Sequence, residues 1–149
     1  MSDTIERKTL IRAPRSRVWK AITDVSQFST WFHVKAEGAF EPGARVSMTS
    51  TYPGYEGIVF YLTVAEIEPE WRLTWHWNPG SEEPPAGVAA PQTLVEFRLD
   101  EVEGGTLVTV VESGFDRVEP AIRAKAFKEN SEGWTIQMES LARYVVETA

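Results

Sequence analysis

The side chains best suited to acid–base chemistry in this sequence are Glu112, His76 and Tyr61. A carboxylate, an imidazole or a phenol that is held against a substrate can transfer a proton in the transition state. Nothing in the sequence brings any two of these residues together. We therefore assign no catalytic residue.

Metal and nucleotide chemistry have no support in the sequence. The chain has two histidines, His33 and His76, and no cysteine. No H-x-x-x-H or H-E-x-x-H spacing occurs, and neither a glycine-rich phosphate loop nor a G-x-S-x-G elbow is present. We predict no metal site and no cofactor, and we interpret both histidines as surface or hydrogen-bonded residues.

Glu112 is the most informative polar residue. If Val108, Val110 and Glu112 share the inward face of a strand, the carboxylate points toward the C-terminal helix near Trp134. Burying a carboxylate without a partner costs several kcal/mol, so Arg7, Arg45 or a donor on a ligand would be needed. The alternative is that Glu112 lies at the strand end and meets water, because acidic residues are almost never fully buried unpaired.

The segment LTWHWNPG, residues 73–80, places two indoles two residues apart. In a strand, Leu73, Trp75 and Trp77 share one face and His76 lies on the other. The two indoles could form a flat wall against an aromatic ligand, or they could simply fill the core. The proline-rich loop at 78–91 that follows could be a lid over a cavity or a solvent-exposed loop without a function.

The helices and strands that must position these residues can be predicted from the spacing of hydrophobic residues and from turn residues. Residues 4–13 predict a strand and residues 14–23 a short helix that begins at Pro14. A second short helix, capped by Asp24 or Ser26, follows. Residues 35–113 predict a meander of antiparallel strands, in which 93–99 and 106–113 form a hairpin across a Gly-Gly turn. In the first of these two strands, Val95, Phe97 and Leu99 face one way.

The last element is a long helix predicted over residues 120–146. Trp134, Met138, Leu141 and Val145 fall at steps of four, three and four, so one apolar stripe faces inward. The order strand, two short helices, six strands and long helix predicts an α+β fold with a curved antiparallel sheet around the C-terminal α-helix. A curved sheet cannot touch a straight helix along its whole length, and the gap becomes a cavity suited to a small ligand.

Composition limits the range of partners. The 149 residues fit a single domain spanning 1–149, and the net charge of −7 disfavours nucleic acid. The absence of cysteine, of a signal-like N-terminus and of a long apolar run predicts a cytoplasmic protein without membrane insertion.

The stretch IRAPRSRVWKAITD, residues 11–24, resembles the opening of the START-like (SRPBCC, birch-pollen-allergen-like) superfamily. The chain is similar, more narrowly, to the branch named for the activator of the ninety-kilodalton heat-shock chaperone's ATPase. Further marks follow in the same order between residues 5 and 146: Trp31-Phe32, the turn region 38–43, Glu66-Ile67-Glu68-Pro69 before Arg72-Leu73, Trp77, Gly105-Thr106 before Glu112-Ser113-Gly114-Phe115, Gly133-Trp134, Leu141 and Tyr144.

The resemblance implies a helix-grip fold with an internal cavity, toward which Trp75 and Trp77 point while His76 points outward. It selects no single activity, because the superfamily contains lipid and hormone binders, polyketide cyclases and aromatases, and ring-hydroxylase subunits. We expect a non-catalytic protein that binds a small apolar or aromatic molecule, lipid-like or polyketide-like. The residues predicted to line its cavity are Trp31, Phe32, Phe60, Trp75, Trp77, Val95, Phe97, Val110, Glu112, Trp134, Met138 and Leu141.

Two other functions stay open at this point. The first is a polyketide cyclase- or aromatase-like enzyme, for which changing Glu112 to Gln should sharply reduce turnover. The second is a protein-interaction module that contacts a chaperone and stimulates its ATPase. A monomer and a homodimer are both compatible with the sequence.

Overall fold

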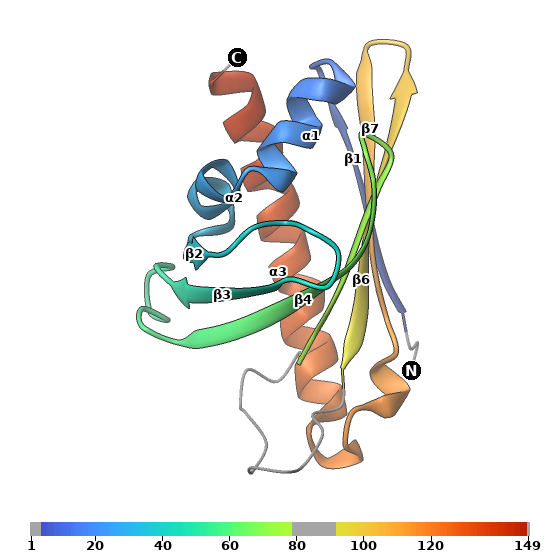
Figure 1. The fold of residues 1–149 in the computed structure, drawn as a ribbon. Coiled ribbons are helices and arrows are strands. Elements are labelled where there is room, and N and C mark those ends of the chain that lie inside the picture. The colour runs from blue at the N-terminus through green and yellow to red at the C-terminus, as the bar shows by residue number, and fades with distance from the viewer. Residues whose placement is uncertain (1–3, 79–91, 149) are drawn as a thin grey trace.

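A computed structural model describes residues 4–78 and 92–148, and it shows one curved antiparallel sheet around a long helix (Figure 1). This confirms the α+β, helix-grip-like architecture. Of the loop predicted at 78–91, all but Asn78 lies outside the described residues. The elements in chain order are β1 (Thr4–Ile11), α1 (Arg15–Thr23), α2 (Val25–Phe32), β2 (Val34–Glu37), β3 (Arg45–Ser50), β4 (Val59–Glu68), β5 (Arg72–Trp77), β6 (Thr93–Val102), β7 (Gly105–Ser113), the 3-10 turn η1 (Phe115–Arg117) and α3 (Pro120–Glu147).

The seven strands are ordered β1-β7-β6-β5-β4-β3-β2, and every neighbouring pair is antiparallel. A bulge between Val64 and Glu66 interrupts the β4–β5 register, and the backbone N–H of Glu66 donates to the Thr74 hydroxyl at 3.0 Å. Bulges bend the strand and increase its twist. This one lies in the middle of the sheet, where it helps the sheet curve around α3.

The short helices are bounded by local hydrogen bonds. Asp24, one of the two predicted caps, accepts from the N–H of Gln27 at 3.0 Å. The prediction that α1 begins at Pro14 is wrong by one residue, because ψ of Pro14 is 149°, which is extended. Pro14 is instead the N-cap, and its carbonyl accepts from the N–H of Arg17 and of Val18. His33 ends α2 in the left-handed region, with φ 59° and ψ 52°.

The β6–β7 turn explains the glycine at position 105. A Cβ on Gly105 would lie 2.1 Å from the carbonyl oxygen of Ile11, and φ of this residue is 151°. Only glycine tolerates both conditions. The predicted Gly-Gly turn therefore also sets how closely β1 approaches the β6–β7 hairpin.

The core lies between the inner face of the sheet and α3, with α1 and α2 beside the helix (Figure 1). The predicted inward residues Val95, Phe97 and Leu99 are fully buried. The predicted stripe of α3 is buried as well, and it comprises Trp134, Met138, Leu141 and Val145. Full burial of such a side chain contributes roughly 1.5–3 kcal/mol, so this packing dominates the placement of α3.

Candidate functional site

Glu112 is fully buried on the inner face of β7. Its cross-strand neighbours are Ile5 on β1 and Val95 on β6, and α3 covers it from above. The alternative that Glu112 meets water at the end of its strand is therefore wrong. Strands on both sides and a helix on top exclude solvent from this position.

Four neutral donors from three elements surround the Glu112 carboxylate. The indole N–H groups of Trp77 and Trp134 donate to its two oxygens at 2.8 Å and 2.9 Å. The Thr93 hydroxyl donates at 2.5 Å, and the Asn130 amide lies at 3.0 Å and 3.1 Å from the two oxygens. An ionised carboxylate only accepts hydrogen bonds, so this ring of donors is complementary to the charged form.

Neither arginine proposed as the partner of Glu112 reaches it in the structure, and that prediction is wrong. Arg7 lies at the sheet edge and donates to the Ser131 hydroxyl at 2.6 Å and to the Thr135 hydroxyl at 3.1 Å. The guanidinium of Arg45 lies 3.9 Å from the centre of the Tyr61 ring. Arg45 pairs with Thr63 in the β3–β4 register, which places it on the outer face of the sheet.

Trp75 and Trp77 both lie on the inner face, as predicted, with exposed fractions of 0% and 9%. Their rings meet edge to face, at 70° and a centroid distance of 5.6 Å, so these two indoles do not form a flat wall, and Trp75 fills the core as in the other alternative. The more nearly parallel pair is Trp77 and Trp134, at 30° and 5.8 Å. It joins the sheet to α3, and both its indole N–H groups point to Glu112.

The three acid–base candidates are separated by the sheet. His76 pairs with Thr63 on the outer face, which Tyr61 shares by alternation along β4, whereas Glu112 lies on the inner face. His33 has Nε2 at 3.3 Å from the Ser140 hydroxyl. Within residues 4–78 and 92–148, no group of three or more His, Asp or Glu side chains could hold a metal ion.

Two adjoining hollows open between α3 and the β3–β4 end of the sheet. The larger, about 440 Å³, is lined by Ser50, Tyr52, Tyr55, Ile58, Phe60, Glu129, Asn130, Glu132, Gly133, Ile136 and Gln137. The smaller, about 150 Å³, is lined by Phe32, Trp77, Glu129, Asn130, Gly133, Trp134 and Gln137. The two hollows share residues of α3 and together are called the α3 cleft below.

The α3 cleft takes in only part of the predicted lining. Phe32, Trp77 and Trp134 line the smaller hollow and Phe60 lines the larger. The remaining predicted residues lie deeper, buried and packed against one another: Trp31, Trp75, Val95, Phe97, Val110, Glu112, Met138 and Leu141.

Sequence reasoning missed the polar and exposed part of the cleft wall. Tyr52 and Tyr55 flank the Pro53-Gly54 pair, whose residue types are typical of a turn and not of a binding site. On α3, Asn130, Gly133 and Gln137 are spaced as one helical stripe beside the apolar stripe. A small residue between two amides on the rim of a buried helix face is the signal that could have indicated this wall.

Gly133 keeps the cleft open. It lines both hollows, and a Cβ built on it would meet no atom within 4 Å. Several apolar side chains near it are exposed, among them Tyr55 at 57%, Ile58 at 40% and Ile136 at 42%. The cleft therefore presents apolar surface to solvent where the helix has no side chain to cover it.

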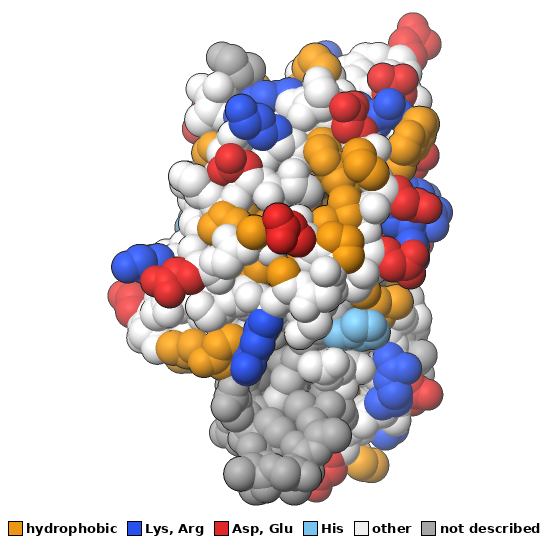
Figure 2. Space-filling model, in the orientation of Figure 1, with side chains coloured by type: hydrophobic (Ala, Val, Ile, Leu, Met, Phe, Trp, Pro, Cys, Tyr) orange, Lys and Arg blue, Asp and Glu red, His pale blue; other side chains and the backbone are white. Residues whose placement is uncertain are grey.

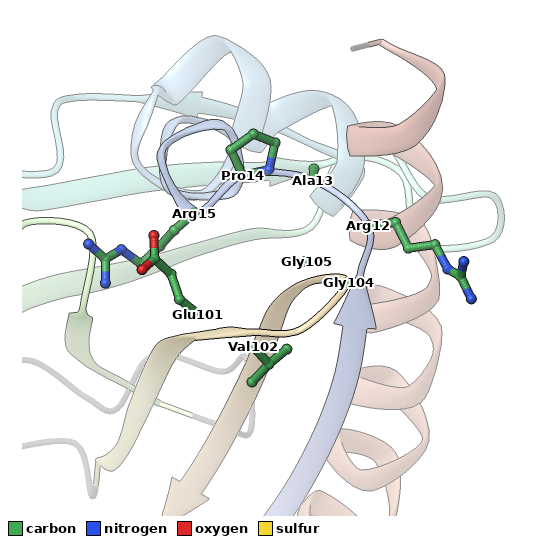
Figure 3. A pocket seen from close by; sticks show the side chains of 8 residues that line it. All are labelled: Arg12, Ala13, Pro14, Arg15, Glu101, Val102, Gly104 and Gly105. Carbon is green, nitrogen blue, oxygen red and sulfur yellow. The ribbon is translucent and has the colours of Figure 1, made fainter.

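A separate hollow of about 460 Å³ lies where β1 passes into α1 and β6 turns into β7 (Figure 3). Arg12, Arg15 and Glu101 line it, and Arg12 points away from the other two. The Arg15 guanidinium lies 3.8 Å from the centre of the Trp71 ring, and its Nε is 3.6 Å from Glu70. Two arginines and one carboxylate line this hollow, and the buried Nε and Nη1 of Arg15 have no hydrogen-bond partner. We favour the α3 cleft as the candidate site because several aromatic side chains line it, as is usual for ligand sites.

On the face in Figure 2, basic and acidic side chains are interspersed, and hydrophobic side chains form patches between them. In the described part of the chain, no helix is both long enough and apolar enough to cross a bilayer.

A family model described as "Activator of Hsp90 ATPase homolog 1-like protein" matches residues 12–146. No curated protein sequence matches the chain.

Solved structures share the fold at low sequence identity. The protein MLL2253 from Mesorhizobium loti has a TM-score of 0.79 at 23% identity, over 98% of each chain. The Aha1 dimer from Colwellia psychrerythraea has a TM-score of 0.73 at 18% identity, over 97% of this chain and 96% of that one. CalU16 from Micromonospora echinospora has a TM-score of 0.67 at 23% identity, over 95% and 75%.

Proposed function

Because the chain belongs to the family of Activator of Hsp90 ATPase homolog 1-like proteins, we propose that it binds a small apolar or aromatic molecule in the α3 cleft. The observation that carries this proposal is the cleft itself. Its larger hollow, about 440 Å³, falls within the roughly 300–1,000 Å³ that is usual for ligand sites. Its lining is mostly aromatic and aliphatic, which is also usual for such sites.

The inner wall of the cleft is rigid enough to act as a binding surface. Trp77 and Trp134 form that wall, and each is fixed by a hydrogen bond to Glu112. Indoles held in one orientation lose little conformational entropy when a ligand packs on them. We propose that the ligand contacts Phe32, Phe60, Trp77 and Trp134, and that the deeper predicted residues support these four without touching it.

Thermal unfolding against a library of flat aromatic and lipid-like compounds tests the proposal. A ligand at a hundred times its Kd adds about 2.7 kcal/mol, which shifts Tm by a few degrees for a protein of this size. Hits are then titrated against Gly133→Leu, which fills the cleft, and Ala124→Leu, which adds the same side chain at an exposed position of α3 that lines neither hollow.

The expected result is at least tenfold weaker binding to Gly133→Leu and unchanged binding to Ala124→Leu. Equal affinity of both variants for every hit would place the ligand elsewhere. A broad library without any Tm shift would contradict the proposed function.

Contact with a chaperone is the second candidate, and the description of the family favours it. Adding this protein in saturating amounts to an Hsp90-type chaperone tests that function through the ATPase rate. A rise in the rate that Gly133→Leu preserves would support a contact through exposed surface and away from the cleft. An unchanged rate would remove this candidate.

A polyketide cyclase-like activity has less support. One structural neighbour, DynU16, is a protein in the dynemicin biosynthetic locus, with a TM-score of 0.72 at 23% identity. Catalysis would need an acid or base held against the substrate, but both oxygens of Glu112 are engaged by protein donors, and the two carboxylates that line the cleft, Glu129 and Glu132, are exposed to solvent. His76 and Tyr61 lie across the sheet from the cleft.

A further inference from the structure

We infer that the ligand of the α3 cleft carries a cationic hydrogen-bond donor, such as an ammonium group, on its apolar or aromatic body. This inference rests on the proposed function and narrows the ligand to one chemical class. It comes from the inner part of the cleft wall, where the indole and amide N–H donors are already engaged by the protein and the Oε1 of Gln137 has no partner.

The donors of the inner wall are engaged by Glu112. The indole N–H groups of Trp77 and Trp134 both donate to its carboxylate, and so does the side-chain amide N–H of Asn130. The indole of Trp75 has a buried N–H without a partner, but Trp75 lines neither hollow. A ligand that needs donors from this wall, such as a carboxylate or a phosphate, would have to displace Glu112.

The two amides in the wall present acceptors. The Nδ2 of Asn130 faces the Glu112 carboxylate, which fixes the orientation of that amide and leaves its carbonyl oxygen on the other side. The Nε2 of Gln137 donates to the carbonyl of Phe32 at 2.9 Å, which fixes the second amide. The Oε1 of Gln137 is buried and has no hydrogen-bond partner. A buried acceptor without a donor is unfavourable, and a donor on a ligand would satisfy it.

The charges around the cleft have the same sign. Glu129 and Glu132 line it, whereas no Lys or Arg does so among the described residues. Glu129 pairs with Lys125, which lines neither hollow and whose Nζ lies 3.8 Å from the Glu129 carboxylate. These carboxylates are exposed and therefore screened by salt, but they favour a cation over an anion.

Aromatic rings complete the environment that favours a cation. Tyr52, Tyr55 and Phe60 line the larger hollow, with Tyr52 and Tyr55 centred 6.1 Å apart. The faces of such rings attract an ammonium group through their quadrupole. The unpaired oxygen of Gln137, two carboxylates and several aromatic rings therefore belong to residues that line one cleft.

The test uses three probes that share one body: phenylbutylamine, phenylbutanol and phenylbutyrate, which are cationic, neutral and anionic at neutral pH. Their Kd values are measured by calorimetry at low ionic strength. We expect the amine to bind about tenfold more tightly than the acid, with the alcohol between them. Added salt should reduce this ratio, because the carboxylates are exposed.

Two variants with the same change in net charge locate the effect. Glu132→Gln removes a carboxylate from the cleft wall, and Glu139→Gln removes an exposed one from the same helix that lines neither hollow. The ratio of amine to acid affinity should fall several-fold in Glu132→Gln and stay unchanged in Glu139→Gln. An equal fall in both variants would mean that the overall charge of −7 sets the preference, and would overturn the inference.

The alcohol separates this inference from the function on which it rests. If phenylbutanol binds in the cleft as tightly as the amine, or if the acid binds best, the cationic class is wrong and the binding function stands. If none of the three probes binds, both the inference and the cleft as an aromatic-ligand site are contradicted.

Discussion

One stretch of α3 contributes both to the ring of donors around Glu112 and to the lining of the α3 cleft, and its polar groups are satisfied in one place and not in the other. Trp134 and Asn130 turn their N–H groups inward, where the carboxylate uses them. Gln137, less than one helical turn beyond Trp134, keeps a buried oxygen without a donor. A fully hydrogen-bonded buried polar group fixes the surrounding side chains, whereas an unsatisfied one beside a cleft indicates where a ligand donor would bind.

Removing the Glu112 carboxylate should destabilise the fold more than any other single change described below. Glu112→Ala leaves the buried donors of Trp77, Trp134, Thr93 and Asn130 without an acceptor, and each such group costs about 1–3 kcal/mol. The free energy of unfolding, measured with urea, should fall by at least about 3 kcal/mol. The matched surface change Glu139→Ala should stay within about 0.5 kcal/mol. A loss below about 1 kcal/mol for Glu112→Ala would mean that the donors find water instead.

A smaller loss of unfolding free energy is expected when one donor to Glu112 is removed and the other three are kept. Trp77→Phe retains an aromatic side chain but deletes the indole N–H that donates to Glu112. We expect unfolding free energy to fall by about 1–3 kcal/mol. Combining it with Glu112→Ala should cost less than the sum of the single changes, because both remove the same hydrogen bond. Strict additivity would show that this bond contributes nothing.

Gly133→Leu should strengthen the fold slightly while blocking the cleft. A glycine within a helix is less favourable than leucine by up to about 1 kcal/mol, and a Cβ at this position meets no neighbour within 4 Å. We expect Tm to stay level or to rise, as measured by circular dichroism. A marked fall in Tm would show that the space beside Gly133 is needed by the fold and is not an open cleft.

The smallest effect on stability is expected at the cleft mouth. Tyr55 is 57% exposed, so Tyr55→Ala should change the unfolding free energy by no more than about 0.5 kcal/mol. The same change should weaken binding of phenylbutylamine several-fold, since the ring lines the larger hollow. Tyr61→Ala, on the outer face, is the control and should leave the Kd unchanged. Identical Kd values for Tyr55→Ala and the parent would remove this ring from the site.

Local pattern was sufficient to predict the layers of the fold. The period of two along 93–99 identified Val95 and Phe97 as inward, and the steps of three and four after Trp134 identified the buried face of α3, because each pattern is set within one element. Asp24 was predictable as a cap for the same reason. The one-residue error at Pro14 arose because proline also fits the position just before a helix.

The hydrogen-bond partners of Glu112 could not be predicted from local sequence pattern. The partners of Glu112 come from β5, β6 and α3, and only the three-dimensional arrangement brings Trp77, Thr93 and Asn130 together. Charge alone pointed to Arg7 or Arg45, whereas neutral donors satisfy the carboxylate. The phase of β5 was predictable, but the 70° angle between Trp75 and Trp77 depends on side-chain torsions that packing decides.

A nitrogen–proton NMR titration of the labelled protein with phenylbutylamine, combined with hydrogen exchange of the indole N–H groups, reports on both the cleft and the Glu112 ring. We predict that the Gln137 side-chain amide and the Gly133 backbone amide shift. The indoles of Trp77 and Trp134 should exchange far more slowly than that of Trp71, which is 50% exposed, both before and after the amine is added. Indole N–H groups of Trp77 and Trp134 that exchange as fast as that of Trp71 would contradict the fixed wall. Chemical-shift changes confined to the outer face of the sheet would contradict ligand binding in the α3 cleft.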